Sequence, residues 1–145
     1  VLRDKPRTPV YQSISEKIEN LINAWRERKI EIEKLYEELK KIHKYLFFVE
    51  EEKRKLGLND VEYSILAILK EKFGKVENLS EKVKKLFENL RKDMSPGWEF
   101  KKSIRSKIER EIRIFLIREF PKMDIGERNE LTNKILQTIE KYKLN

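Results

Sequence analysis

The sequence predicts an all-α fold. Charged residues make up 41% of the chain, glycine and proline contribute only four residues each, and apolar residues recur three and four positions apart. At 145 residues the chain is long enough for one hydrophobic core. We expect one long, heptad-patterned helix followed by about four shorter helices packed as an irregular bundle. Residues 1–12 are expected to form an extended lead-in from an upstream region, and residues 13–145 a single helical domain.

The long helix is predicted to begin at Ser13, which has the spacing of a capping box with Glu16, and to end before a left-handed cap at Gly57. Only Arg28 and Lys53 interrupt its heptad stripe. The stripe consists of Ile18, Leu21, Trp25, Ile32, Leu35, Leu39, Ile42, Leu46, Val49 and Leu56. Such a helix is longer than one small core covers. Either the rest of the chain folds back along it, or another protein completes the stripe.

Four shorter amphipathic helices are expected after it, over residues 60–73, 78–94, 98–120 and from residue 124 onward. The stretch Leu58-Asn59-Asp60 caps the first of them, and Gly74 ends it. Ser95-Pro96-Gly97 is a turn sequence that stops the second. Asp124 and Glu127 cap the last helix. These local signals predict where the chain turns.

The excess of basic residues is concentrated in one region. The chain carries 34 basic and 26 acidic residues, for a net charge of +8, and residues 91–122 hold ten of the basic residues and five of the acidic ones. A basic ring around this helix is typical of a solvated surface, whereas a DNA-binding helix more often has one basic stripe. Arg105, at the margin of the apolar face, is suited to a carboxylate pair within the domain or across an interface. The candidate partner or DNA contacts on this helix are Lys101, Arg105, Lys107, Arg110 and Arg113.

Both tryptophans lie on predicted apolar faces. Core packing is the first interpretation of Trp25 and Trp98, and anchoring a partner protein is the alternative. The single histidine, His43, lies at the edge of the long stripe without a nearby aspartate, and we expect it at the surface.

Several kinds of chemistry are not predicted. The chain has no cysteine, its four glycines are too scattered for a phosphate-binding loop, and its acidic-x-Lys triplets lie on a predicted helix. We therefore expect no catalytic residue, cofactor or metal site in this chain. No apolar run is long enough to span a membrane, which favours a cytoplasmic protein. The chain begins without methionine, so we expect it to be a fragment of a longer polypeptide.

Four stretches carry a resemblance to a known family. Leu56-Gly57-Leu58 precedes a short helix with an acidic cap, Lys92-Asp93 leads to Trp98, and Ile104-Arg105-Ser106-Lys107-Ile108 lies in the next helix. Residues 3–12 are similar to the stretch that leads into the family's domain. In this order and spacing, the sequence resembles the C-terminal helical domain of the restriction subunit of type I restriction-modification enzymes.

The resemblance implies which functions of the restriction subunit belong to this chain and which belong to upstream domains. In that family the nuclease domain and the ATP-driven DNA motor lie upstream, so ATP and Mg²⁺ are expected only there. The resemblance implies that this chain docks the restriction subunit onto a methyltransferase core of modification and specificity subunits, with DNA nearby in the assembled enzyme. The alternative is a helical module that binds the DNA backbone without sequence preference. An uncovered heptad face also predicts a homodimer of the isolated domain.

Overall fold

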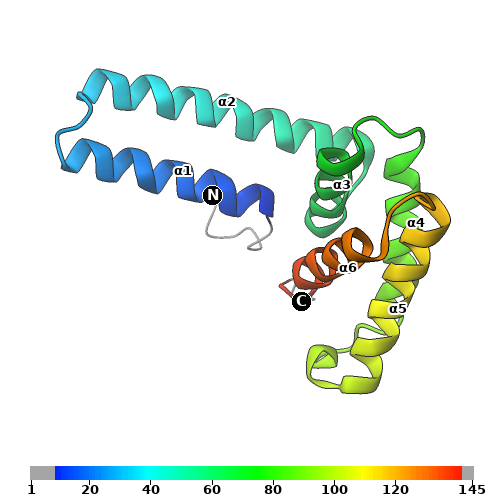
Figure 1. The fold of residues 1–145 in the computed structure, drawn as a ribbon. Helices are drawn as coiled ribbons and strands as arrows, with labels where there is room; N and C mark the ends of the chain where they lie inside the picture. Colours follow the sequence, from blue (N-terminus) through cyan, green and yellow to red (C-terminus); the bar gives the residue numbers. More distant parts are fainter. Residues whose placement is uncertain (1–8, 142–145) are drawn as a thin grey trace.

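The computed structural model describes residues 9–141, which are helical throughout apart from turns and short connections. The prediction of an all-α bundle is confirmed. The elements are α1 (Pro9–Arg26), α2 (Ile32–Leu56), α3 (Asp60–Phe73), α4 (Leu79–Arg91), the 3₁₀-helix η2 (Trp98–Phe100), α5 (Lys102–Glu119) and α6 (Ile125–Glu140). Helices α1 and α2 form an antiparallel hairpin, the arm, which projects from the other helices (Figure 1). Those other helices, α3 to α6 with η2, form the body.

The prediction of one long helix from residue 13 to residue 56 is wrong, because the chain reverses between α1 and α2. Arg28 adopts a left-handed conformation with φ 59°. The amide of Lys29 donates to the carbonyl of Ala24, and the amide of Arg28 to that of Trp25. This is the Schellman pattern, which usually places glycine at the left-handed position. The interruption of the stripe at Arg28 was therefore the end of a helix.

The start of the first helix also differs from the prediction. Residues 9–12 were expected to be extended, but α1 begins at Pro9, whose fixed φ suits the first helical position. Ser13 therefore lies inside the helix and caps nothing. Tyr11 is only 2% exposed and belongs to the core. The rest of the expected lead-in, residues 1–8, lies outside the described residues.

The caps of the later helices agree with the prediction. Gly57 ends α2 with φ 68°, and Asn59 forms a reciprocal capping box with Glu62 at the start of α3. Asp124 accepts a hydrogen bond from the Glu127 amide at the start of α6. The expected helix over residues 98–120 is divided, because Lys101 is extended between η2 and α5. The helix expected to reach residue 94 ends at Arg91.

The main core lies in the body, around α3. Its fully buried members include Ile65 and Leu69 on α3, Ile112 and Leu116 on α5, and Ile135 on α6. The arm contributes Tyr11 and Val49 to this core, both from the end nearest the body. The free end of the arm therefore lies beyond the main core, and its inner face is covered only by the pairing of α1 with α2.

Candidate protein-interaction site

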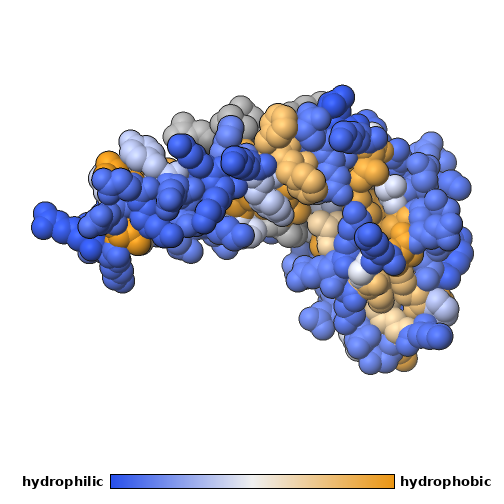
Figure 2. All heavy atoms as spheres, turned by 90° about the horizontal axis from the view of Figure 1, so that it is seen from above, coloured by the Kyte–Doolittle hydropathy of each residue, from blue (hydrophilic) through white to orange (hydrophobic). Residues whose placement is uncertain are grey.

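Large apolar side chains are exposed along the arm. At its free end, Trp25 is 41% exposed, Ile32 45% and Tyr36 60%. Nearer the body, the rings of Phe47 and Phe48 are also exposed. Figure 2 views the arm from the side of α2 and shows hydrophobic surface at both places between hydrophilic stretches. Clusters of this kind on a projecting element are typical of surfaces that bind another protein.

The two helices of the arm also leave a groove between them. Its volume is about 490 Å³, and apolar side chains of both helices line it, including Ile14, Leu21 and Ile42. Lys17 lies over the ring of Tyr45, 5.9 Å from its centre, at one edge of the groove. The groove adds a concave apolar surface to the exposed side chains of the arm.

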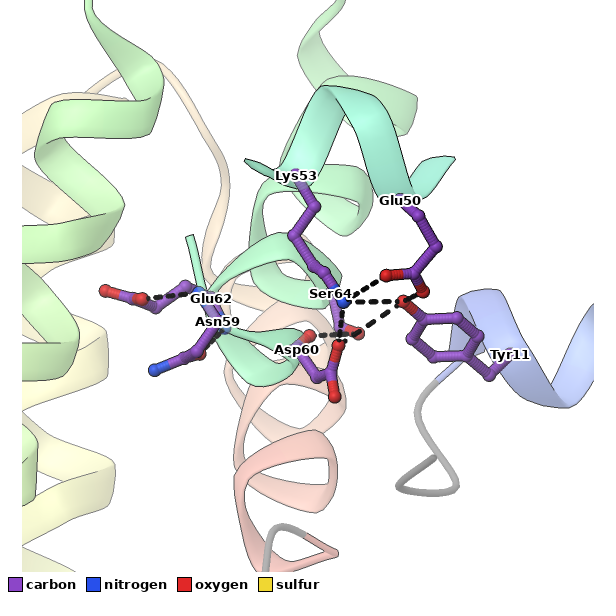
Figure 3. Close-up of polar contacts among 7 residues, drawn as sticks. All are labelled: Tyr11, Glu50, Lys53, Asn59, Asp60, Glu62 and Ser64. Carbon is purple, nitrogen blue, oxygen red and sulfur yellow. Dashed lines mark hydrogen bonds and ion pairs between the residues drawn. The ribbon is translucent and has the colours of Figure 1, made fainter. Parts of the chain in front are cut away.

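A polar cluster fixes the arm to the body (Figure 3). Lys53, whose side chain is 11% exposed, makes ion pairs with Asp60 at the start of α3 and with Glu50, the latter at 2.9 Å. The hydroxyl of Tyr11 donates to Glu50 at 2.5 Å and accepts from the Lys53 ammonium at 3.0 Å. Residues from α1, α2 and α3 thus meet at one cation. We call Tyr11, Glu50, Lys53 and Asp60 the junction cluster.

A second polar contact supports the junction. The hydroxyl of Tyr63 on α3 donates to Glu52 on α2 at 2.8 Å, and Lys70 pairs with the other oxygen of Glu52 at 3.4 Å. Together with the junction cluster, this contact holds the end of α2 against α3. The polar residues therefore position the arm against the body.

The junction cluster and the second polar contact raise the pKa of three groups between them. Burial raises the pKa of the Tyr11 hydroxyl, and its hydrogen bond to Glu50 raises it further. Burial and Glu52 act in the same way on the pKa of Tyr63. Burial alone would lower the pKa of the Lys53 ammonium, but its contacts with Asp60, Tyr11 and Glu50 outweigh burial and raise it. All three groups therefore stay protonated at neutral pH.

These shifts predict a loss of stability in alkali. A group whose pKa is higher in the folded chain stabilises the fold fully below its ordinary pKa, which is 10.0 for tyrosine, and loses this contribution at higher pH. The free energy of unfolding should thus be level towards pH 10 and fall above it. Urea titrations of the chain and of Tyr63→Phe at rising pH will test this. We expect a smaller alkaline decrease in the variant, and an equal decrease would contradict the assignment.

The candidate residues of the basic region do not converge on one surface site. Trp98 is 4% exposed and packs in the core, so its first interpretation is confirmed and it offers little surface to a partner. Arg105 pairs within the domain, through Nε and Glu140 Oε1 at 2.6 Å, which ties α5 to α6. Lys107 pairs with Asp93, and Arg113 with Glu109 one turn away. The remaining two, Lys101 and Arg110, are exposed.

The interpretation of Trp25 as a core residue is wrong. Trp25 lies one turn before the reversal at Arg28, at the free end of the arm, where 41% of it remains exposed. Its position is consistent with the alternative interpretation, an anchor for a partner. His43 is exposed, as expected.

Helices α4 and α5 form a second groove, which is basic. It has a volume of about 800 Å³, and Leu86 and Phe115 are among the apolar residues that line it. Its cations are Lys82, Lys85, Lys92, Lys107 and Arg118. Three carboxylates lie among them, and two of these, Asp93 and Glu119, already pair with Lys107 and Lys82. Of the two helices that form this groove, only α5 was identified as basic from the sequence.

A family model matches nearly the whole chain. It describes the C-terminal region of type I restriction enzyme HindI endonuclease subunit-like proteins, and it covers residues 3–145. The chain belongs to this family. The family resemblance predicted from the sequence is confirmed. No curated protein and no solved structure matches the chain significantly.

As the C-terminal domain of a type I restriction endonuclease subunit, the chain is part of a multisubunit enzyme. None of the helices over residues 9–141 is both long and apolar enough to cross a lipid bilayer. In the same part of the chain, no three histidine, cysteine, aspartate or glutamate side chains are grouped as ligands for a metal ion.

Sequence reasoning missed two features of this restriction-subunit domain. It treated Lys53 as a simple interruption of the stripe, although a lysine at a core-facing position signals a buried ion pair. It also missed a basic stripe formed by Lys82 and Lys85 on α4 and by Lys92 at its C-cap, which recur at helical spacing. That periodicity is visible in the sequence and could have been found there.

Proposed function

We propose that this domain attaches the restriction subunit to the methyltransferase core of the type I enzyme, made of the modification and specificity subunits. The free end of the arm makes the contact. The observation that carries the proposal is the exposure of Trp25, Ile32 and Tyr36 on an element that projects beyond the main core. Tryptophan and tyrosine are favoured at the centres of protein interfaces, because they bury much area and lose few rotatable bonds.

The geometry also argues against the other surface considered from the sequence. Trp98 is buried, and Arg105 already has a carboxylate partner in Glu140. Charge reversal at Arg105 would therefore first break a contact between α5 and α6, and a loss of binding would have a structural explanation. The arm offers side chains whose removal leaves the body intact.

Binding of the intact restriction subunit to the purified methyltransferase core will test the proposal. Trp25→Ala with Ile32→Asn should weaken binding at least tenfold, as expected of about 2 kcal/mol from an interface anchor. Phe100→Ser is the matched control, because Phe100 is 87% exposed on η2 in the body. Unchanged binding by the arm variant, with circular dichroism showing that both variants are folded, would contradict the proposal.

A second candidate function rests on the basic groove between α4 and α5. Its five cations against three carboxylates favour contact with the DNA backbone, in addition to docking. Lys85 on α4 and Lys92, which caps the C-terminal end of α4, both line the groove.

Salt dependence distinguishes binding to the DNA backbone from other binding. For the restriction subunit on duplex DNA, Lys85→Ala with Lys92→Ala should reduce the slope of log K against log salt by about 0.9 for each phosphate that the variant no longer neutralises. Lys34→Ala, an exposed lysine of the arm, should leave the slope unchanged. Equal slopes for all three proteins would show that this groove does not bind DNA.

A further inference from the structure

The outer face of α2 is a surface distinct from the free end of the arm. Successive residues of an α-helix are about 100° apart, so the side opposite the inner-face residues Leu39, Leu46 and Val49 can be identified. The residues on this outer face are Glu37, Lys40, Lys44, Phe47, Phe48, Glu51 and Lys55. Phe47 is 63% exposed and Phe48 59% exposed, and the view from the side of α2 shows hydrophobic surface there (Figure 2).

The charges on this face have a definite order along the helix. An acidic residue, Glu37, is followed by the basic Lys40 and Lys44, then by the two phenylalanines, then by the acidic Glu51 and the basic Lys55. All of the charged members are exposed except Glu51, which is partly buried and pairs with Arg54 in its own helix. Because an exposed ion pair within one helix contributes little, Glu51 is available for a better partner.

This order is self-complementary only when two copies of α2 run antiparallel. Suppose that the two-fold axis crosses the outer face of α2 at the level of residues 45 and 46. Lys40 of one copy then faces Glu51 of the other, and Glu37 faces Lys55. The symmetry repeats both contacts, which gives four pairs of opposite charge. Parallel pairing in register would instead place Lys40 against Lys40 and Glu51 against Glu51, which is repulsive.

The phenylalanines lie at the centre of the same arrangement. Phe47 and Phe48 are within three residues of the two-fold axis, so the rings of both copies meet there and bury each other. Lys44 of the opposite copy lies beside them, where a cation over an aromatic face is favourable. An apolar centre with charged pairs around it is the usual composition of an interface between proteins.

We propose that the outer face of α2 binds the outer face of α2 in a second copy of this chain, antiparallel, through Phe47 and Phe48 and the charge pairs Lys40 with Glu51 and Glu37 with Lys55. The free ends of the two arms then point in opposite directions, each alongside the start of α3 in the other copy, and neither Trp25 nor Ile32 is on the outer face of α2. Self-association and docking to the methyltransferase core therefore use different residues, and each can fail without the other.

Sedimentation equilibrium of the 145-residue chain, from low micromolar to near-millimolar concentration, tests the proposal. We expect a concentration-dependent dimer. Lys40→Glu and Glu51→Lys should each weaken dimerisation about tenfold, because each turns two attractive pairs into repulsive ones. The double variant should return to within a few-fold of the original chain, because the pairs form again with their signs exchanged.

The apolar centre is tested separately. Phe47→Ser with Phe48→Ser should abolish the dimer, while Phe100→Ser, which removes an exposed ring from the body, should leave it unchanged. Circular dichroism will establish that each variant is helical. A monomer at every concentration, a dimer that survives the loss of both phenylalanines, or a double charge variant as weak as the single ones would overturn the proposal. So would a dimer that only Trp25→Ala disrupts, because that outcome places the contact at the free ends.

Discussion

Replacing Ile112 by alanine is expected to lower the free energy of unfolding by about 2–5 kcal/mol. Ile112 lies on α5, has no exposed surface and belongs to the main core of the body. Truncation removes buried methyl and methylene groups and leaves a cavity that the close-packed neighbours fill only partly. Urea denaturation followed by circular dichroism will measure the change as a lower midpoint with the same slope.

The same helix provides the control for this prediction. Ile114 is two residues away and is 49% exposed, so Ile114→Ala removes the same atoms from a site that stays in contact with water. We expect its cost to be below about 1 kcal/mol. Similar costs at the two positions would mean that α5 does not turn Ile112 towards the main core and Ile114 away from it.

Replacing Lys53 by alanine should lower the free energy of unfolding by about 2–3 kcal/mol. The variant leaves Glu50 and Asp60 close together beneath Tyr11 without the cation that they share. Removing one partner of a deeply buried pair costs more than this, but the partial exposure of the two carboxylates reduces the penalty here. Urea denaturation at neutral pH will measure it.

Two further variants show whether unpaired charge is the cause. Lys34→Ala removes an exposed lysine of the same helix that is not on its outer face, and should cost less than about 0.5 kcal/mol. Lys53→Met with Asp60→Asn removes the cation together with one carboxylate, and we expect it to recover part of the stability. If this double variant is as unstable as its two single changes added together, the charges do not interact.

The sequence was sufficient for features that depend on nearby residues. The helical class follows from composition and periodicity, and the caps at Gly57, Asn59 and Asp124 follow from residues within one turn of each helix end. The caps were predictable because the side chain that satisfies a free backbone group is local. The family was also identified from short stretches whose order covers most of the chain.

Features that depend on distant residues were missed. The reversal at Arg28 has no glycine to mark it, so the heptad spacing continued across a turn. Because the first helix ends before Arg28, α1 and α2 pair face to face. Trp25, at the end of α1, stays exposed. The interaction of Lys53 with Tyr11 joins residues 42 positions apart, and no local pattern brings them together.

The separation of the free end of the arm from the main core means that substitutions at these two places affect stability independently. Substitutions at sites that share no neighbours usually have additive effects on stability. The free end of the arm lies beyond the core that surrounds Ile112, so sequence change at Trp25 or Ile32 leaves that core unaltered. The sequence at the free end of the arm can therefore change while the body conserves the fold, without compensating substitutions in the core.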